Sequence, residues 1–377
     1  MERSGFQRKT AGIKSPAFVI DEAKVESNLK VLKKVKQDSG CKILLAQKAF
    51  SMFSLYPLIS KYLDGVCSSG LFEAKLGREE FGKEVHTFAP AFREDQFDEI
   101  SKYSDFIVFN SISQLKKFEK KSDGKKLGLR VDPGKSFSPF EMYDPSQSSR
   151  FGIAKLDSLP SGVSGLHFHA LCEKGAEELE EVLESFEKRF GPVLNDIEWA
   201  NFGGGHQITQ DGYNVEKLIG IIKKFKKNHP NVKEVYLEPG EAVVLNAGYL
   251  ITTVLDTGKE GFVIVDTSVE SHLPDVMITR LEKRPYIPPV WESSAKGKYK
   301  YKFGGVSCAA GDVIAEYSFN KPLKAGDRLT FLDAAHYSMV KVTTFNGVGL
   351  ADIWLLKKDG GLKQIRAFGF EDFKSRL

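Results

Sequence analysis

The sequence is poor in cysteine and histidine, with four and seven residues respectively among 377. The cysteines, Cys41, Cys67, Cys172 and Cys308, are widely separated and form no Cys-x-x-Cys pair. Neither a disulfide framework nor a Cys/His zinc site is therefore expected. We interpret the thiols as reduced, as in a cytoplasmic protein, and most of them as small buried apolar side chains.

The chain also lacks long apolar runs and an excess of charge of one sign. No stretch of about 18 apolar residues occurs, so no membrane span is predicted, and residues 1–9 contain no apolar signal-peptide core. Lys and Arg number 54 against 50 Asp and Glu, a formal net charge of +4. This balance gives no indication of nucleic-acid binding. The chain is longer than a single hydrophobic core usually supports, so two domains are expected.

The first two thirds of the chain alternate short apolar runs with amphipathic helical patterns. Segments such as 177–190 and 215–228 have apolar residues at helical spacing. Strands, bounded by turn or capping residues, are predicted at 42–46, 65–69, 85–88, 105–109, 126–131, 164–168, 197–202 and 234–237. This alternation predicts a (β/α)8 TIM barrel over residues 20–241. The loop 132–161 is long and rich in Ser and Pro, which is typical of functional loops.

The pattern changes after Glu238-Pro239-Gly240. Helical spacing nearly disappears, and strands are predicted at 243–254, 262–266, 298–303, 328–332, 340–344 and 353–356. We therefore predict a C-terminal all-β domain of barrel or sandwich type. Because the N-terminal residues read as extended, we expect this β-domain to comprise residues 1–19 and 242–377.

The carboxyl ends of the strands carry the active site in a (β/α)8 barrel. A lysine desolvated by apolar neighbours has a lowered pKa and attacks aldehydes, and a glycine turn lets backbone N–H groups approach a phosphate. A carboxylate at the same mouth can keep a heteroaromatic nitrogen protonated, as pyridoxal phosphate requires. The residues in these positions are Lys48, His169, Gly203, Gly204, Gly205 and Glu238. They predict covalent amine chemistry on a phosphorylated ligand.

Each of these features has a simpler alternative. Lys48 could extend from a strand end into solvent, the glycines could form a tight turn, and Glu238 could serve an ordinary ion pair. His167 and His169 share one face of a strand, which could suggest a metal site. The sequence shows no third ligand at a useful spacing, so a metal is not predicted.

Two positions in the predicted β-domain are also candidates. Cys308 lies among small residues with Asp312 downstream, and Tyr337 follows a predicted strand. The alternatives are a buried thiol and a tyrosine that packs with its hydroxyl satisfied.

Together these features resemble the pyridoxal-phosphate decarboxylases of the alanine-racemase-like fold, the group that contains ornithine and diaminopimelate decarboxylases. The resemblance covers nearly the whole chain, in the same order: Ala46-Gln47-Lys48-Ala49-Phe50, Leu129-Arg130-Val131-Asp132-Pro133, Ser149-Arg150-Phe151-Gly152, Phe168-His169, Gly203-Gly204-Gly205, Glu238-Pro239-Gly240, Cys308 with Gly311-Asp312, and Tyr337 before Thr344-Phe345-Asn346-Gly347. Within the group, runs such as Ser271-His272-Leu273-Pro274-Asp275 are most similar to members that act on carboxylated polyamines.

The resemblance implies a role for each candidate. Lys48 would bond covalently to pyridoxal 5'-phosphate, His169 would stack on its ring, and Glu238 would pair with its ring nitrogen. Gly203 to Gly205 and Tyr337 would bind its phosphate. Cys308 would come from the partner subunit of a homodimer and return a proton to the substrate carbon after decarboxylation.

One departure from the group points to the substrate. Ornithine and diaminopimelate decarboxylases carry Arg after Glu-Pro-Gly, whereas this chain has Glu241. The reversed charge suits a cationic polyamine arm and disfavours a distal carboxylate. Glu241 and Asp275 are the expected substrate ligands, with Glu173, Glu270 and Asp312 as secondary candidates.

Three other functions are weighed against this interpretation. The first is diaminopimelate- or ornithine-type decarboxylation, or racemisation, on the same fold. The second is a non-catalytic pyridoxal-phosphate-binding protein, which leaves the β-domain with Cys308 unexplained. The third is a barrel aldolase that works without this cofactor.

Overall fold

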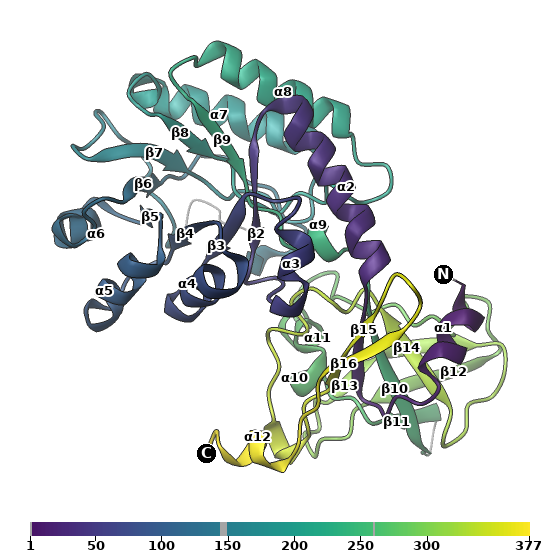
Figure 1. Ribbon diagram of the computed structural model, residues 1–377. Helices are drawn as coiled ribbons and strands as arrows, with labels where there is room; N and C mark the ends of the chain where they lie inside the picture. Colours follow the sequence, from purple (N-terminus) through teal and green to yellow (C-terminus); the bar gives the residue numbers. More distant parts are fainter. Residues whose placement is uncertain (1, 144–148, 259–260) are drawn as a thin grey trace. The chain divides into compact units, whose positions relative to one another are not determined.

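A computed structural model describes residues 2–143, 149–258 and 261–377. The chain forms two compact units, and both chain ends belong to the same one (Figure 1). The barrel unit comprises Glu26–Val243, and the sheet unit combines Met1–Val25 with Val244–Leu377. Of the long loop 132–161, residues 144–148 lie outside the described residues.

The barrel unit is built on a closed ring of parallel strands. In ring order these are β2 (Lys42–Ala46), β3 (Gly65–Ser68), β4 (Glu84–Phe88), β5 (Phe106–Phe109), β6 (Lys126–Arg130), β7 (Val163–His167), β8 (Trp199–Asn201) and β9 (Glu234–Leu237). β9 pairs with β2 and closes the ring. Each predicted barrel strand overlaps one of these, and the predicted (β/α)8 fold is confirmed.

Helices surround the strands on the outside of the barrel (Figure 1). They are α2 (Glu22–Ser39), α3 (Tyr56–Ile59), α4 (Leu71–Leu76), α5 (Glu94–Tyr103), α6 (Ile112–Phe118), α7 (Ala176–Leu194), α8 (Val215–Asn228) and α9 (Glu241–Val244). A π-helix, Gly77–Phe81, continues α4. In α7 the apolar residues Leu179, Val182, Phe186 and Phe190 are buried, as the helical spacing predicted.

Large side chains fill the barrel interior. Leu44, Phe106, Val108, Trp199 and Tyr236 form one buried cluster. Trp199 fits only because its neighbours on β6 and β7 are glycines: a Cβ on Gly128 or Gly165 would lie 2.4 Å or 2.0 Å from the indole ring. The interior is therefore a packed core, and chemistry is left to the strand ends.

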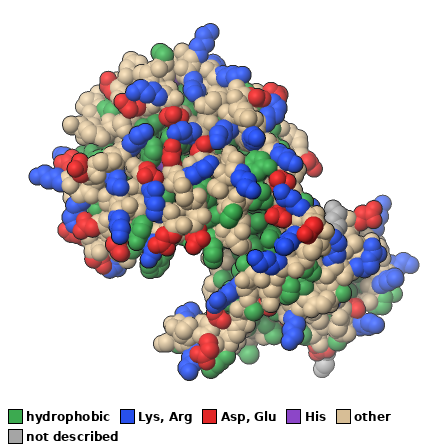
Figure 2. Space-filling view, in the orientation of Figure 1, with side chains coloured by type: hydrophobic (Ala, Val, Ile, Leu, Met, Phe, Trp, Pro, Cys, Tyr) green, Lys and Arg blue, Asp and Glu red, His purple; other side chains and the backbone are tan. Residues whose placement is uncertain are grey.

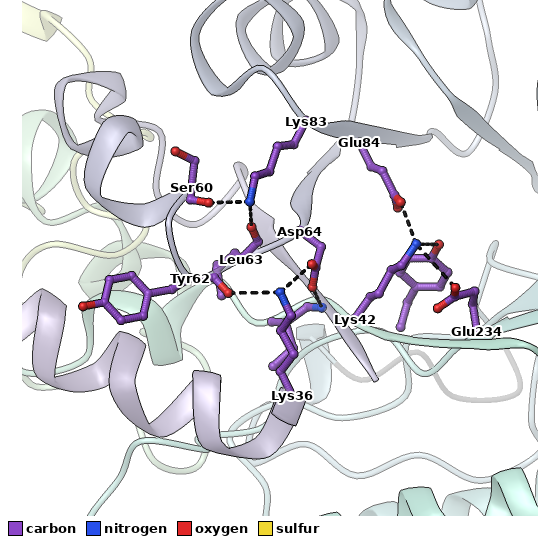
Figure 3. Close-up of polar contacts among 11 residues, drawn as sticks. Lys36, Lys42, Ser60, Tyr62, Leu63, Asp64, Lys83, Glu84 and Glu234 are labelled. Atoms are coloured by element: carbon purple, nitrogen blue, oxygen red, sulfur yellow. Dashed lines mark hydrogen bonds and ion pairs between the residues drawn. The ribbon is translucent and has the colours of Figure 1, made fainter. Parts of the chain in front are cut away.

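A network of charged groups lies at the amino ends of the strands (Figure 3). The Lys42 ammonium lies 2.7 Å from Glu84 Oε1 and 3.6 Å from Glu234 Oε1. The other Glu84 oxygen lies 3.2 Å from Nε2 of the buried His86, whose ring stacks on Phe106. Burial opposes ionisation of Glu84, but His86 and Lys42 outweigh it and lower the pKa of this carboxyl to about 2.

Glu84→Gln is expected to reduce the free energy of unfolding at pH 7 by roughly 1–3 kcal/mol. Because the folded-state pKa of Glu84 is depressed, its contribution is present above the unfolded value near 4.5 and is lost as the pH falls toward about 2. Thermal unfolding at pH 7, 5, 4 and 3 should show the Tm difference between Glu84→Gln and the parent narrowing with acidity. Glu198→Gln is the control, because that carboxylate is 57% exposed and 3.4 Å from Lys233. A Tm difference for Glu84→Gln that does not change with pH would contradict the ion network.

The sheet unit contains strands from both ends of the chain. They are β1 (Ala17–Asp21), β10 (Gly248–Thr257), β11 (Phe262–Val265), β12 (Tyr299–Gly304), β13 (Val313–Phe319), β14 (Arg328–Leu332), β15 (Asp352–Leu356) and β16 (Leu362–Arg366). Their order is β13-β12-β11-β10-β1-β15-β16, with β14 also paired to β10. The predicted C-terminal β-fold is confirmed as a mixed sheet. β1 joins it between β10 and β15, as expected for the N-terminal segment.

The sheet unit differs from the prediction in several places: β13 and β16 were not predicted, and two predicted segments have another structure. Residues 1–19 were expected to be extended, but α1 (Arg3–Thr10) is helical; its buried Phe6 packs 4.3 Å from the Tyr249 ring. Residues 340–344 form no strand, because the Val340 and Lys341 N–H groups both bond to the Tyr337 carbonyl in a turn. The remaining helices are α10 (Val269–His272), α11 (Pro274–Ile278) and α12 (Phe370–Lys374).

The visible surface carries Lys and Arg side chains interspersed with Asp and Glu (Figure 2). Within the described ranges, no helix is both long and apolar enough to cross a membrane.

Candidate active site

Three polar side chains meet where β7, β8 and β9 end. The Glu238 carboxylate accepts a hydrogen bond from the Asn201 amide at 2.7 Å, and its second oxygen lies 3.3 Å from His167 Nε2. Asn201 ends β8, His167 ends β7 and Glu238 directly follows β9, so parallel pairing brings them together. The Glu238 side chain is only 13% exposed.

These contacts keep Glu238 ionised. Burial opposes the charged form, but the His167 ring and the Asn201 amide outweigh it and lower the pKa of Glu238 to about 2. Burial also lowers the pKa of His167. The His167 contact and the Asn201 amide leave a fixed carboxylate at the barrel mouth.

His169 lies just beyond the end of β7 and is held in one orientation. Its Nδ1 accepts a hydrogen bond from the Gly204 N–H at 3.0 Å, so the proton of the neutral ring is on Nε2. Burial is the main reason that the pKa of His169 lies well below its ordinary value, and the positive charges of Lys48 and Arg130 add to the effect. A neutral, oriented imidazole at this position can stack on a planar ring.

The three glycines after β8 are required by close backbone approach. A Cβ on Gly203 would lie 2.4 Å from the Phe168 carbonyl, and one on Gly205 would lie 1.8 Å from the Leu171 carbonyl. Both glycines also have positive φ angles, of 70° and 84°.

Two of the glycine N–H groups that were expected to bind a phosphate already donate hydrogen bonds within the protein. The Gly203 N–H donates to the Asn201 side chain at 2.9 Å, and the Gly204 N–H donates to His169. These two amides therefore order the neighbouring side chains. The turn nevertheless keeps side-chain atoms away from this part of the mouth, which leaves room for an anionic group next to backbone.

Lys48 follows β2 and is exposed, so the apolar enclosure expected from its sequence neighbours is not observed. The residues that precede Lys48 are buried instead. Gln47 is fully buried, and its amide donates to the Glu73 carbonyl at 2.5 Å. The Lys48 ammonium is close enough to His169 to lower its pKa, after the larger effect of burial. The amine is thus accessible at the mouth beside the proposed stacking ring.

Two charged residues at the mouth were not predicted as site residues. Arg130 is 7% exposed, lies 4.5 Å from the Phe88 ring and 4.6 Å from the Phe151 ring, and donates to the His169 carbonyl at 3.4 Å. Burial lowers its pKa to about 10, so it remains charged at neutral pH. Its signal in the sequence is an arginine that ends an otherwise apolar strand.

Glu73 is the second unpredicted residue. Its carboxylate accepts the Ser69 N–H at 2.6 Å at the start of α4. Burial raises the pKa of Glu73, and the Lys48 charge opposes that effect, which places this acid near the amine. Its signal in the sequence is weak: Glu73 lies four residues after Ser69, in the stretch that follows the predicted strand 65–69.

The expected substrate ligand Glu241 lies in the same unit, in the first turn of α9. Its carboxylate accepts a hydrogen bond from the Gln207 amide at 2.7 Å. Cys172 links it to the mouth. Burial raises the pKa of this thiol to about 11, the charges of Glu173 and Glu241 raise it further, and the Lys48 charge opposes the rise. Glu173 is exposed and has a positive φ of 50°. An acidic group is thus present near the amine and the histidine.

Cys308 differs from the other three cysteines. Burial raises the pKa of Cys41 to about 11 and that of Cys67 well above its usual value, and Cys172 is raised in the same way. Cys308 is exposed, and its backbone N–H donates to the Asn346 amide oxygen at 2.7 Å. The structure therefore supports reading three thiols as packing groups and Cys308 as accessible.

Asp312 does not behave as a substrate ligand. It is 4% exposed, and its two carboxylate oxygens accept the Val269 N–H at 2.9 Å and the Ser307 N–H at 3.0 Å. A Cβ on Gly305 would lie 2.2 Å from this carboxylate. Asp312 instead ties the Cys308 loop to the start of α10, because both oxygens already have backbone partners.

Asp312→Asn is expected to lower the free energy of unfolding by about 1–3 kcal/mol, because an amide presents one acceptor where two N–H donors need one each. The same change should raise the rate at which iodoacetamide alkylates Cys308, because the loop loses an anchor. Thermal unfolding and peptide mass spectrometry measure the two effects. Glu316→Gln, an exposed position on β13, is the control. A variant with parent stability and parent alkylation rate would remove this anchoring role.

Asp275 and Tyr337 also lie in the sheet unit. Asp275 is in the first turn of α11, and its Oδ1 lies 2.5 Å from the Lys341 ammonium. Tyr337 has a positive φ of 53°, a conformation that non-glycine residues adopt rarely and often at functional sites. Glu270, in α10, accepts the Thr343 hydroxyl through its carbonyl at 3.0 Å. The candidates thus form two sets, one at the barrel mouth and one in the sheet unit.

The barrel set fits pyridoxal 5'-phosphate. An ionised, nearly buried carboxylate suits a protonated ring nitrogen, and an accessible amine suits an aldehyde. A neutral imidazole and a glycine turn free of side chains suit an aromatic ring and its phosphate.

Comparison with known proteins gives a consistent result. Residues 17–335 match the family described as pyridoxal-dependent decarboxylase, C-terminal sheet domain. The carboxynorspermidine/carboxyspermidine decarboxylase of Campylobacter jejuni is 41% identical over 97% of this chain and 98% of its own. The carboxyaminopropylagmatine decarboxylase of Synechocystis is 38% identical over 98% of this chain and 97% of its own.

Solved structures show the same similarity. The crystal structure of carboxynorspermidine decarboxylase complexed with norspermidine, from Campylobacter jejuni, aligns with a TM-score of 0.88 at 40% identity, covering 97% of this chain and 100% of that chain. A diaminopimelate decarboxylase structure, 20% identical, aligns with a TM-score of 0.82 and covers 98% of this chain and 95% of that chain; it shares the fold.

Proposed function

Because the chain belongs to the pyridoxal-dependent decarboxylases, we propose that it removes the carboxylate of carboxynorspermidine, carboxyspermidine or both. The products are norspermidine and spermidine. The observation that carries the substrate class is Glu241, an acid at the barrel mouth held by Gln207 at 2.7 Å. A carboxylate there attracts an ammonium-bearing arm and repels a distal carboxylate. Similarity to the Campylobacter jejuni enzyme supports the same substrates.

The candidate residues would hold pyridoxal 5'-phosphate for this reaction. Lys48 would bond to it through its amine, His169 would stack on the ring and Glu238 would pair with the ring nitrogen. Gly203 to Gly205, together with Tyr337 from a sheet unit, would bind the phosphate. When bound, the cofactor supplies an electron-accepting ring that takes up the electron pair left when carbon dioxide departs. Glu238 supports this because it stays ionised and keeps a proton on the ring nitrogen.

The proton balance is completed by Cys308. The bond between Cα and the carboxylate breaks, carbon dioxide leaves, and Cα gains one proton, which Cys308 Sγ supplies. Among the four thiols, Cys308 is the exposed one, which supports this role. Glu241 and Asp275 bind the ammonium groups of the substrate, with Glu173 and Glu270 as further acids, whereas Asp312 positions the Cys308 loop.

The active enzyme in this proposal is a cytoplasmic homodimer with composite sites, in which Cys308 of one protomer serves the barrel of its partner. Mixing inactive Lys48→Ala and Cys308→Ala protomers tests this arrangement. If sites are composite, heterodimers hold one site with both residues intact, and random mixing should restore about a quarter of parent activity, because half of the dimers have one of two sites working. No recovery after verified subunit exchange would contradict shared sites.

Substrate assays with mass-spectrometric product detection decide the chemistry. The purified enzyme with added cofactor is offered carboxynorspermidine, carboxyspermidine, carboxyaminopropylagmatine, diaminopimelate and ornithine separately. We expect kcat/KM to be highest for the first two. Turnover of diaminopimelate or ornithine alone would support the alternative activities on this fold, and turnover of none would support a non-catalytic cofactor-binding protein.

Carboxyaminopropylagmatine is the second candidate substrate. A relative with this activity is 38% identical over almost the full chain. Acids such as Glu241 and Asp275 also suit its terminal guanidinium, which binds carboxylates in a bidentate fashion. The ratio of kcat/KM between this substrate and carboxyspermidine distinguishes the two.

A further inference from the structure

The Asp275 carboxylate, proposed above as a substrate ligand, already holds a cation of the protein. Lys341 Nζ lies 2.5 Å from Asp275 Oδ1, and the two side chains are 29% and 19% exposed. The pair is therefore partly exposed, and the Lys341 ammonium neutralises the carboxylate that the substrate ammonium is proposed to bind.

The backbone that carries Lys341 is anchored, and its ammonium has a second partner besides Asp275. The Lys341 N–H bonds to the Tyr337 carbonyl at 3.0 Å, and the Thr343 hydroxyl donates to the Glu270 carbonyl at 3.0 Å. Farther along the segment, the Gly349 carbonyl lies 3.0 Å from His272 Nε2. The Lys341 ammonium also lies 4.6 Å from the centre of the Tyr337 ring. An aromatic face attracts a cation, so the flexible stem can leave Asp275 without losing all stabilisation.

The Lys341 ammonium would compete with the substrate ammonium for the Asp275 carboxylate. A polyamine arm ends in a primary ammonium on an alkyl chain, which is the same group that Lys341 presents. A second ammonium near Asp275 would be repelled by Lys341 as long as Lys341 stays in place. Binding therefore requires that one ammonium replace the other.

We propose that Lys341 is an internal counter-ion of Asp275 that the substrate ammonium displaces, and that it thereby sets the affinity for the polyamine arm. This inference rests on the proposed function, because it assumes that Asp275 is a substrate ligand. The Lys341 ammonium, which already lies 4.6 Å from the centre of the Tyr337 ring, keeps that contact when the substrate takes its place at Asp275. Lys341 is thus a specificity-determining residue that acts through Asp275.

The test compares the holoenzyme with Lys341→Met, Lys341→Arg, Asp275→Asn and the Lys341→Met/Asp275→Asn double variant. Norspermidine binding is measured by calorimetry, and KM is measured with carboxynorspermidine. Lys341→Met should bind norspermidine about two- to fivefold more tightly, in the range of a partly exposed ion pair, with a matching fall in KM. Lys341→Arg keeps the charge and should resemble the parent. Asp275→Asn should weaken binding, and in its background Lys341→Met should give no tightening.

Several results would overturn the inference. Weaker or unchanged binding in Lys341→Met would show that Lys341 orients Asp275 or is irrelevant. Equal tightening with and without Asp275 would show general repulsion rather than competition for one carboxylate, and an unchanged affinity in Asp275→Asn would remove Asp275 from the site.

Failure of the proposed function can be distinguished from failure of this inference. If the parent enzyme shows neither polyamine turnover nor norspermidine binding, the proposed function is overturned, and the inference with it. Turnover by the parent with no tightening in Lys341→Met sinks the competition alone. Cofactor content and Tm verify that each variant is folded. Lys217→Met, which removes a lysine 3.1 Å from Glu180 on the outer helices, is the matched control and should leave norspermidine binding unchanged.

Discussion

Glu238→Gln is expected to lower kcat for carboxynorspermidine by about 10²- to 10³-fold, the cost of losing one preorganised charge at a reacting centre. The native carboxylate is ionised throughout the physiological range, because its pKa is about 2. A neutral amide cannot hold a proton on the ring nitrogen of the cofactor, so the electron pair left by carbon dioxide is less stabilised. Steady-state kinetics on preparations of equal cofactor content measure the effect.

The same substitution should also change stability in a predictable direction. The folded pKa of Glu238 is depressed, so its carboxylate stabilises the protein above the unfolded value near 4.5, and this contribution is lost as the pH falls toward about 2. Glu238→Gln should therefore reduce Tm at pH 7 more than at pH 4. Glu234→Gln, at the opposite end of β9, is the matched control and should keep parent kcat. Parent-like kcat in cofactor-replete Glu238→Gln would remove Glu238 from catalysis.

The barrel strands could be predicted because the apolar runs in the sequence are the segments that the folded barrel buries. Strands buried on both faces read as continuous apolar runs, and the runs at 42–46 and 234–237 coincide with β2 and β9. The sheet unit was less predictable. β16 is partly exposed, and its sequence, Leu-Lys-Gln-Ile-Arg, is mostly polar, so no apolar run marks it. α1 is polar in sequence and depends on packing of Phe6 against Tyr249 and Trp291.

The site shows a similar division. Residues fixed by strand ends, such as Lys48, His169 and Glu238, follow from the position of each strand in a parallel barrel. Partners that lie far apart in sequence do not. The Lys341–Asp275 pair joins residues 66 positions apart, and the two backbone partners of Asp312 come from different loops. Sequence spacing indicates residue types at a site, but not which of them are already engaged by the protein.

Lys48→Ala is expected to have the largest effect, a loss of kcat of roughly 10³-fold or more, because the amine attaches the cofactor covalently. The exposed position of Lys48 beyond β2 makes the amine available to an aldehyde without rearrangement of the strand. The parent holoenzyme should therefore show a visible absorption band that borohydride removes, and reduction should leave the cofactor on the peptide that contains residue 48. In the variant, reduction should leave no cofactor on this peptide.

The spectroscopic readout separates loss of covalent attachment from loss of folding. Lys75→Ala, an exposed lysine on α4 that pairs with Glu79 at 3.8 Å, is the control and should keep the band and the labelled peptide. A cofactor-labelled peptide elsewhere in reduced Lys48→Ala would show that another amine carries the cofactor. A parent enzyme that shows no band when saturated with pyridoxal phosphate would be inconsistent with Schiff-base attachment altogether. Since His169 and Glu238 are positioned by Gly204 and Asn201 rather than by Lys48, the variant should still bind the cofactor noncovalently, with a weaker Kd.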